Sequence, residues 1–202
     1  MPPVENKYFV FPEQGGLERD YKPVHNHLMP GVTDQTLMQN SVTMTTTAEL
    51  AADEVVVTVS ITNDKTGHHV PTGAPMRHMI LAIQAKDANG NVLSLQDGPV
   101  LPVWTGDYAG QPGRYYAKIL QDEWTGEAPT AAYWRDIHLV EDTRLPAYGT
   151  DVSRYAFEAP GQGPVTVEVQ LVYRRAFQEL MEQKDWDDPD IVMEAEKIII
   201  TP

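Results

Sequence analysis

The chain has 202 residues, 42% of them hydrophobic, which is enough for the core of one domain with or without an arm. Its formal net charge of -14 argues against binding to nucleic acid or to an anionic lipid surface, because both need a basic footprint. It holds no cysteine and no apolar run near the ~20 residues that span a bilayer, so we expect neither a disulfide nor a membrane span.

Residues 1–40 differ in character from the rest of the chain. They contain five prolines and no sustained periodicity, so we expect an extended arm with short turns. The first residues lack the basic-then-apolar pattern of a signal peptide. Apolar side chains in the arm, among them Tyr8, Phe11 and Tyr21, favour docking on a partner over a disordered tail.

The next segments alternate as strands do. Residues 42–50 alternate weakly between apolar and polar side chains. In residues 55–63 the odd positions 55, 57, 59 and 61 are apolar, with Thr58, Ser60 and Thr62 in alternation, which predicts a strand with one buried face. Residues 76–86 form the next apolar segment. The Asp-Ala-Asn-Gly-Asn turn at 87–91 then predicts a hairpin to a strand at 92–95.

The second half of the chain begins with an irregular segment. Residues 98–129 are rich in glycine, proline and aromatic side chains, and we expect an elaborated excursion there. Residues 153–157, 165–173 and 191–200 follow the strand pattern. Residues 178–184 are the one segment that favours a helix, and it is short.

Several strands, recurrent Gly and Pro and almost no helix predict two antiparallel sheets packed face to face. The predicted fold class is therefore all-β, an immunoglobulin-like antiparallel β-sandwich with one short helix. The sandwich is expected over residues 41–202, behind an extended N-terminal arm of residues 1–40 that docks on a partner.

Three short motifs follow one another between residues 25 and 175. The most specific is a Gly-His-x-x-Pro-Thr-Gly loop at residues 67–73, preceded by Thr62-Asn63. A His-x-x-Pro-Gly segment lies before it at residues 27–31, and an Asp-Thr-Arg-Leu-Pro segment lies after it at residues 142–146, followed by a strand that ends at Arg174. Together they resemble the C-terminal β-domain of multihaem cytochromes c, without the haem-binding portion.

This resemblance implies a place beside haem. A chain without cysteine cannot attach haem through Cys-x-x-Cys-His, so any haem c would be carried by a partner chain. We therefore expect a multihaem c-type cytochrome subunit as the partner in a hetero-oligomer, and a periplasmic or extracellular location.

The histidines near the motifs are the candidate cofactor-binding residues. His27 matches the histidine before Pro-Gly that the resemblance implies as an axial ligand, and His25 lies beside it; the alternative is that both are surface residues of the arm. His68 matches the loop histidine of the family. Its ring either bonds a backbone carbonyl to hold the turn or ligates the partner's haem iron, and His69 is its neighbour.

Other candidates have simpler interpretations. His78 and His138 lie within apolar segments and are interpreted as core or boundary residues with their hydrogen bonds satisfied. The acidic turns at 87–91 and 185–190 do not fit an EF-hand loop and are interpreted as solvated turns. The tryptophans and tyrosines either line a sugar or haem-edge surface or fill the core and its rims. No phosphate loop, dinucleotide fingerprint or Gly-x-Ser-x-Gly motif is present.

The favoured hypothesis is a non-catalytic accessory subunit of a multihaem cytochrome c electron-transfer assembly. Its β-sandwich would pack on haem-bearing chains and donate His27 or His68 as an axial ligand in trans. One alternative is a plain β-sandwich interaction or adhesion module with structural histidines. Another is a small metal-binding protein or metalloenzyme that uses His25, His27, His68 and His69 together.

Overall fold

The structure, a computed structural model, describes residues 8, 10–18, 31–51 and 53–201. The chain divides into two compact units, residues 1–34 and residues 35–202. The described elements of the first unit are two 3-10 helices, η1 (Pro12–Gln14) and η2 (Gly31–Thr33). The described strands all belong to the second unit.

The first sheet has the strand order β1-β2-β8-β4, and all its neighbours are antiparallel. Its strands are β1 (Thr43–Ala51), β2 (Glu54–Thr62), β8 (Thr150–Glu158) and β4 (Leu95–Asp97). The predicted alternation is present from residue 57 onward, because Val57, Val59 and Ile61 are buried while the residues between them, Thr58 and Ser60, are partly exposed. Val56 is buried as well, so the start of the strand does not alternate.

The second sheet has the order β10-β9-β3-β5 and is also antiparallel. Its strands are β10 (Ile191–Ile200), β9 (Val165–Arg174), β3 (His78–Lys86) and β5 (Gly113–Tyr116). The long pairing of β3 with β9 runs from His78 opposite Arg174 to Lys86 opposite Thr166. This register places His78 and Arg174 side by side at one end of the sheet.

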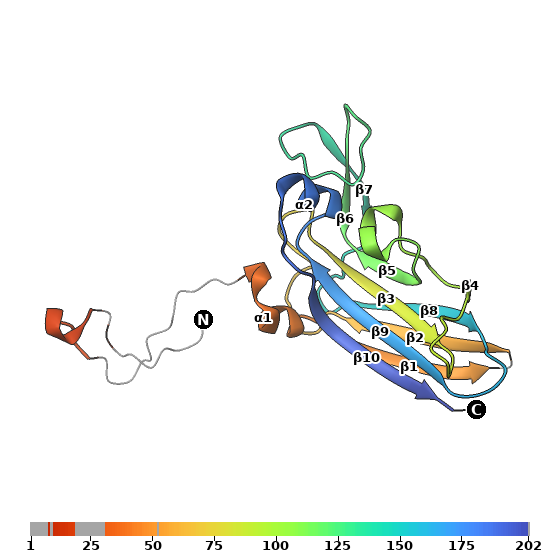
Figure 1. The fold of residues 1–202 in the computed structure, drawn as a ribbon. Coiled ribbons are helices and arrows are strands. Elements are labelled where there is room, and N and C mark those ends of the chain that lie inside the picture. The colour runs from red at the N-terminus through yellow and green to blue at the C-terminus, as the bar shows by residue number, and fades with distance from the viewer. Residues whose placement is uncertain (1–7, 9, 19–30, 52, 202) are drawn as a thin grey trace. The chain divides into compact units, whose positions relative to one another are not determined.

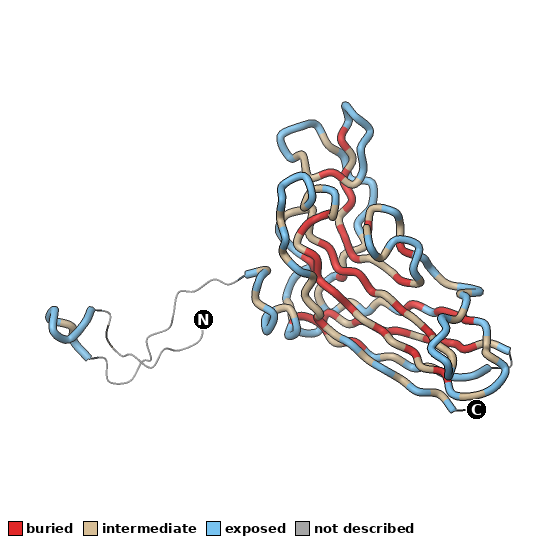
Figure 2. Tube along the Cα trace, in the orientation of Figure 1, coloured by how far each residue is buried: buried red, intermediate tan, exposed pale blue. Residues whose placement is uncertain are grey.

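The core lies between the two sheets, where the buried residues follow the facing strands (Figures 1 and 2). Each buried Val, Leu or Ile side chain contributes about 1.5–3 kcal/mol relative to an exposed one, so these faces supply the main stabilisation. The fully buried side chains with the largest volumes include Tyr116, Tyr155, Phe157, Ile61, Met79, Leu81 and Leu171. The predicted all-β, immunoglobulin-like antiparallel sandwich is confirmed.

Three elements gather at one end of the sandwich (Figure 1). They are a two-stranded ribbon of β6 (Lys118–Asp122) and β7 (Ile137–Asp142), the 3-10 segment η3 (Val103–Tyr108) and the helix α2 (Gln178–Lys184). The helix has the bounds that the sequence predicts. The strands β5, β6 and β7 were not predicted.

The predicted hairpin after residue 86 is only partly correct. The turn forms, since the Asp87 backbone N–H donates to the Asn91 carbonyl at 2.9 Å. Beyond it, the pairing with β3 stops after an isolated bridge between Lys86 and Val92, and the chain crosses to pair β4 with β8 in the other sheet. The segment at 92–95 therefore connects the two sheets instead of extending one.

The predicted boundary at residue 40 differs from the structural division. Residues 35–39 form a short helix, α1 (Gln35–Gln39), that lies in the second unit and contacts β10, where Gln39 Nε2 donates to the Val192 carbonyl at 3.3 Å. The chain thus has more helix than the single segment predicted. None of the helices in the described ranges has the length and apolar character that a bilayer crossing requires.

Candidate functional site

Asn63, directly after β2, holds the histidine loop in place. Its side chain is fully buried, and Nδ2 donates to the carbonyls of His68 at 2.8 Å and Leu145 at 3.1 Å. Its Oδ1 accepts from Thr66 Oγ1 at 2.5 Å. One amide thus satisfies backbone groups from two loops that lie far apart in the sequence.

Backbone hydrogen bonds complete this junction between the loops at residues 63–75 and 142–149. Val70 and Leu145 exchange hydrogen bonds of 2.9 and 2.8 Å, and both side chains are buried. Asn63 N–H donates to the Gly149 carbonyl at 2.9 Å, and Tyr148 N–H donates to the Asn63 carbonyl at 2.8 Å. Two of the three sequence motifs therefore contact each other.

His68 and His69 are both exposed on this loop. The Nδ1 atom of His68 lies 2.9 Å from the carbonyl oxygen of His69. Because a carbonyl oxygen can only accept, this contact is a hydrogen bond when Nδ1 carries the proton. The lone pair of Nε2 then faces away from that bond, and Nε2 has no hydrogen-bond partner among the described residues.

An ion pair stands beside the histidine loop. Arg144 donates from Nε and Nη2 to the two carboxylate oxygens of Asp142, at 2.8 and 2.6 Å. These hydrogen bonds lower the pKa of Asp142, and the proximity of His69 lowers it further. Asp142 therefore stays ionised and is already occupied by its arginine.

The histidines do not form a metal site within the described part of the chain. There, no group of three or more His, Cys or acidic residues is placed to hold a metal ion. His25 and His27 lie outside the described residues, so their predicted roles and any contact with His68 stay predictions. The described structure brings His68 and His69 to one loop and leaves His78 and His138 elsewhere.

His78 is buried on the second sheet, and only one of its two ring nitrogens is satisfied. Nδ1 lies 3.0 Å from the Met76 carbonyl, whereas the buried Nε2 has no hydrogen-bond partner in the part of the chain that the structure describes. The ring stacks on Phe177 at 5.2 Å and meets the edge of Trp104 at 5.4 Å. Burial lowers its pKa to about 4. The prediction of a fully hydrogen-bonded core histidine is therefore wrong for Nε2.

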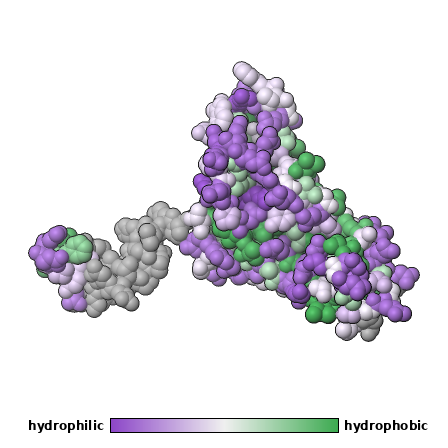
Figure 3. Space-filling model, viewed as in Figure 1, coloured by the Kyte–Doolittle hydropathy of each residue, from purple (hydrophilic) through white to green (hydrophobic). Residues whose placement is uncertain are grey.

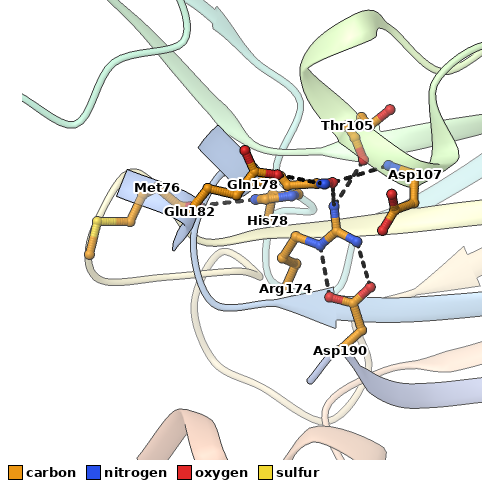
Figure 4. Close-up of polar contacts among 8 residues, drawn as sticks. All are labelled: Met76, His78, Thr105, Asp107, Arg174, Gln178, Glu182 and Asp190. Atoms are coloured by element: carbon orange, nitrogen blue, oxygen red, sulfur yellow. Dashed lines mark hydrogen bonds and ion pairs between the residues drawn. The ribbon is translucent and has the colours of Figure 1, made fainter. Parts of the chain in front are cut away.

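Next to His78, Arg174 anchors a buried polar network (Figure 4). Its guanidinium donates from Nε and Nη2 to the two oxygens of Asp190, both at 2.8 Å, and from Nη1 to the Thr105 carbonyl at 2.9 Å. Gln178 Oε1 accepts from the Asp107 backbone N–H at 3.1 Å. The network joins the end of β9 to η3, α2 and the start of β10.

No sequence motif marks this network as a site. The sequence signal for it is a charged residue, Arg174, directly after the alternating strand at 165–173. The acidic run at 185–190 was interpreted as a solvated turn, but two of its carboxylates pair with arginines. Asp190 binds Arg174, and Asp188 binds Arg175 at 2.5 Å.

The acidic turn at 87–91 behaves as a turn. Asp87 Oδ1 accepts from the backbone N–H groups of Asn89 and Asn91, both at 2.8 Å. His138 is exposed on β7, where its Nδ1 lies 2.6 Å from Glu123 Oε1. It is a surface residue of the ribbon, as the boundary interpretation expects.

The chain is similar to a penta-haem cytochrome c552 from Thermochromatium tepidum, with 25% sequence identity and a TM-score of 0.65. The similarity covers 84% of this chain and 42% of the cytochrome, so this chain spans less than half of that protein's length. The predicted resemblance to part of a multihaem cytochrome is supported in this coarse form. No protein-family model and no curated protein matches the chain.

Two further solved structures are similar in fold only. A collagen-binding domain from a Staphylococcus aureus adhesin has 11% identity and a TM-score of 0.32, covering 79% of this chain and 97% of that domain. An ASH/PapD-like domain of human CEP192 has 7% identity and a TM-score of 0.29, covering 91% and 99%. Scores this low carry no argument about function.

Proposed function

We propose that this chain is a non-catalytic β-sandwich component of a multihaem cytochrome c electron-transfer assembly outside the cytoplasm. It packs on a haem-bearing polypeptide and fixes the geometry of that partner. The haem c of the partner supplies reversible one-electron transfer. The chain itself supplies a rigid surface and candidate imidazole ligands.

The observation that carries this proposal is the similarity to the penta-haem cytochrome c552, which extends over 84% of this chain. The lack of cysteine in these residues supports a haem that is attached outside them, because covalent attachment of haem c needs Cys-x-x-Cys-His. In the proposed role, the sandwich serves the assembly through packing and through imidazole ligands offered to the partner's iron.

His68 fits the donation of one axial ligand. Its ring is exposed, and the bond from Nδ1 to the His69 carbonyl leaves the Nε2 lone pair available to iron. The loop that carries it is held from below by the buried Asn63 amide, which limits the motion of the ring. His27 is proposed as a second donor on the resemblance of its motif alone.

Purification from the native source tests membership of the assembly. The tagged chain, isolated under mild conditions, is expected to bring down a polypeptide with covalently bound haem in a fixed ratio. A pyridine haemochrome assay measures the haem, and mass spectrometry identifies its attachment peptides. A preparation without c-type haem, or with haem at a ratio that varies between preparations, would contradict the proposal.

A haem c peptide with one axial histidine and an open sixth position tests ligand donation separately. Added to the full chain, it is expected to show the Soret shift of a bis-histidine complex. His68→Ala and His27→Ala should reduce the shift, whereas His138→Ala, which removes another exposed imidazole, should not. Equal loss in all three variants would show only adventitious imidazole binding and would remove the ligand role.

A further inference from the structure

A pocket of about 890 Å³ opens between η3, α2 and the loop that joins β6 to β7. This volume lies in the upper part of the range of about 300–1,000 Å³ that is usual for ligand sites. The pocket can therefore hold more than one inserted side chain. Hydrophilic side chains dominate this end of the sandwich (Figure 3). The pocket belongs to none of the motifs discussed above.

Aromatic side chains form part of its wall. Trp104 and Phe177 line it with their rings edge to face at 5.5 Å, and Trp134 lines it from the ribbon loop. Trp134 is 71% exposed and stands edge to face with Tyr133, which is 80% exposed. An exposed tryptophan at the rim of a pocket is typical of a binding surface, because tryptophan gains much from burial by a partner.

Acidic side chains form most of the charged lining of the pocket. Glu127, Glu179 and Glu182 line the pocket, and none of them has an ion pair within the described residues. The one lining arginine, Arg135, is already bound to the buried Asp122 at 2.8 Å. The pocket therefore carries carboxylates without counter-charges.

We infer that this pocket binds a basic segment of a partner protein, which inserts lysine or arginine side chains between the tryptophans and the carboxylates. Carboxylates attract the cationic group, and tryptophan faces are the best aromatic partners for it. The aliphatic stem of Lys or Arg packs on the same rings. This inference does not depend on the proposed function, since it follows from the pocket alone.

The probe is a short peptide of alternating lysine and alanine, titrated into the full chain with calorimetry and with NMR of the backbone and indole N–H groups. The expected result is saturable binding, with shifts concentrated at the Trp104 and Trp134 indoles and along α2. Because two attractive carboxylates become repulsive ammonium groups, Glu127→Lys combined with Glu179→Lys should weaken binding by about tenfold or more.

Matched controls separate the pocket from the general acidity of the chain. Glu49→Lys combined with Glu158→Lys makes the same charge change on exposed β1 and β8 positions outside the pocket. Trp134→Ala, in the pocket, is paired with Trp124→Ala, an 83% exposed tryptophan of the same loop that does not line it. The pocket variants should weaken binding, and their controls should leave it within about twofold.

Three results would overturn the inference. Equal weakening by pocket and control variants would show non-specific attraction to an acidic protein. Shifts spread over the whole surface would show the same. Binding of free arginine amide as tightly as the peptide would show a site for small cations and not for a protein segment.

Discussion

Asn63 connects two loops through a single small side chain. Three hydrogen bonds from one buried amide hold the loop that presents His68 against the loop that contains Leu145. If the amide is removed, each carbonyl keeps one other donor, Thr66 Oγ1 for His68 and the Val70 N–H for Leu145, but the links from Asn63 to both loops are lost. The geometry of the exposed histidine therefore depends on a residue that has no chemistry of its own.

Asn63→Ala is expected to lower the free energy of unfolding by about 2–4 kcal/mol, because it removes three hydrogen bonds from a fully buried position at once. Urea denaturation followed by fluorescence measures the change. Asn89→Ala is the matched control, since Asn89 is exposed in a turn and donates there through its backbone. Equal effects in the two variants would show that the amide does not hold the junction.

His78 is a buried residue whose protonation couples to folding. Its pKa is about 4 in the folded chain, below the usual 6.5 of a free imidazole, because burial opposes the charged ring and Arg174 lies nearby. Between these values the unfolded chain binds the proton more readily. The stabilisation is therefore fully present above pH 6.5 and is lost as the pH falls toward 4.

The loss attributable to His78 is up to about 3 kcal/mol across that window. His78→Phe keeps an aromatic ring beside Phe177 and Trp104 and should flatten the pH dependence of stability there. His138→Ala, at an exposed position of the ribbon, should keep the wild-type profile. The expectation is wrong if His78→Phe and the wild type lose stability in parallel between pH 6.5 and pH 4, as measured by urea denaturation.

At the scale of elements, the end of the sandwich with η3 and α2 is held by a buried charge pair in addition to apolar packing around Phe177 and Trp104. The Arg174 side chain is only 7% exposed, and its fork bonds Asp190 from the start of β10 while also reaching η3. Breaking one member of such a pair leaves the other charge buried and uncompensated.

Asp190→Ala is expected to cost about 3 kcal/mol or more of folding stability. It should also increase amide hydrogen exchange in η3 and α2, which the network connects. Asp188→Ala removes the neighbouring pair with Arg175, whose side chains are 38% and 31% exposed, and should cost under about 1 kcal/mol. Similar costs for the two variants would refute the distinction between the buried pair and the exposed one.

The strands that could be predicted from the sequence differ from the others in how regularly buried and exposed residues alternate along them. The strands at 55–63 and 165–173 were recovered because each has one buried face and an alternating pattern. The strands β6 and β7 were missed because Ile119 and Leu120 are both buried in succession, while five of the six residues of β7 are exposed. A bulge between Ile119 and Leu120 explains the break in alternation.

At the scale of the whole molecule, the topology is strongly non-local. The central pairings join β2 to β8 and β3 to β9, segments that are separated by most of the sandwich in sequence. The one predicted local hairpin is reduced to a turn because the chain changes sheets after Val92. The core therefore closes only when distant segments meet.

Such a topology is expected to fold on the millisecond-to-second scale and not in microseconds. Stopped-flow tryptophan fluorescence after dilution from urea measures the rate. Two variants compare the core with the periphery. Val57→Ala changes a buried residue in the centre of the first sheet, and Leu139→Ala changes an exposed residue of the ribbon. Microsecond refolding would contradict the expectation, as would equal effects of these two variants on the folding and unfolding rates.

The sequence by itself determined the sandwich strands with one buried face, the helix at 178–184, the acidic surface and the lack of haem-attachment cysteines. These properties are local or compositional, so they can be read without knowing which segments meet. Only the tertiary structure decided the roles of Asn63, His78 and Arg174 and the existence of the acidic aromatic pocket. Each of these depends on backbone and side chains that are distant in sequence and are brought together when the sheets pair and pack.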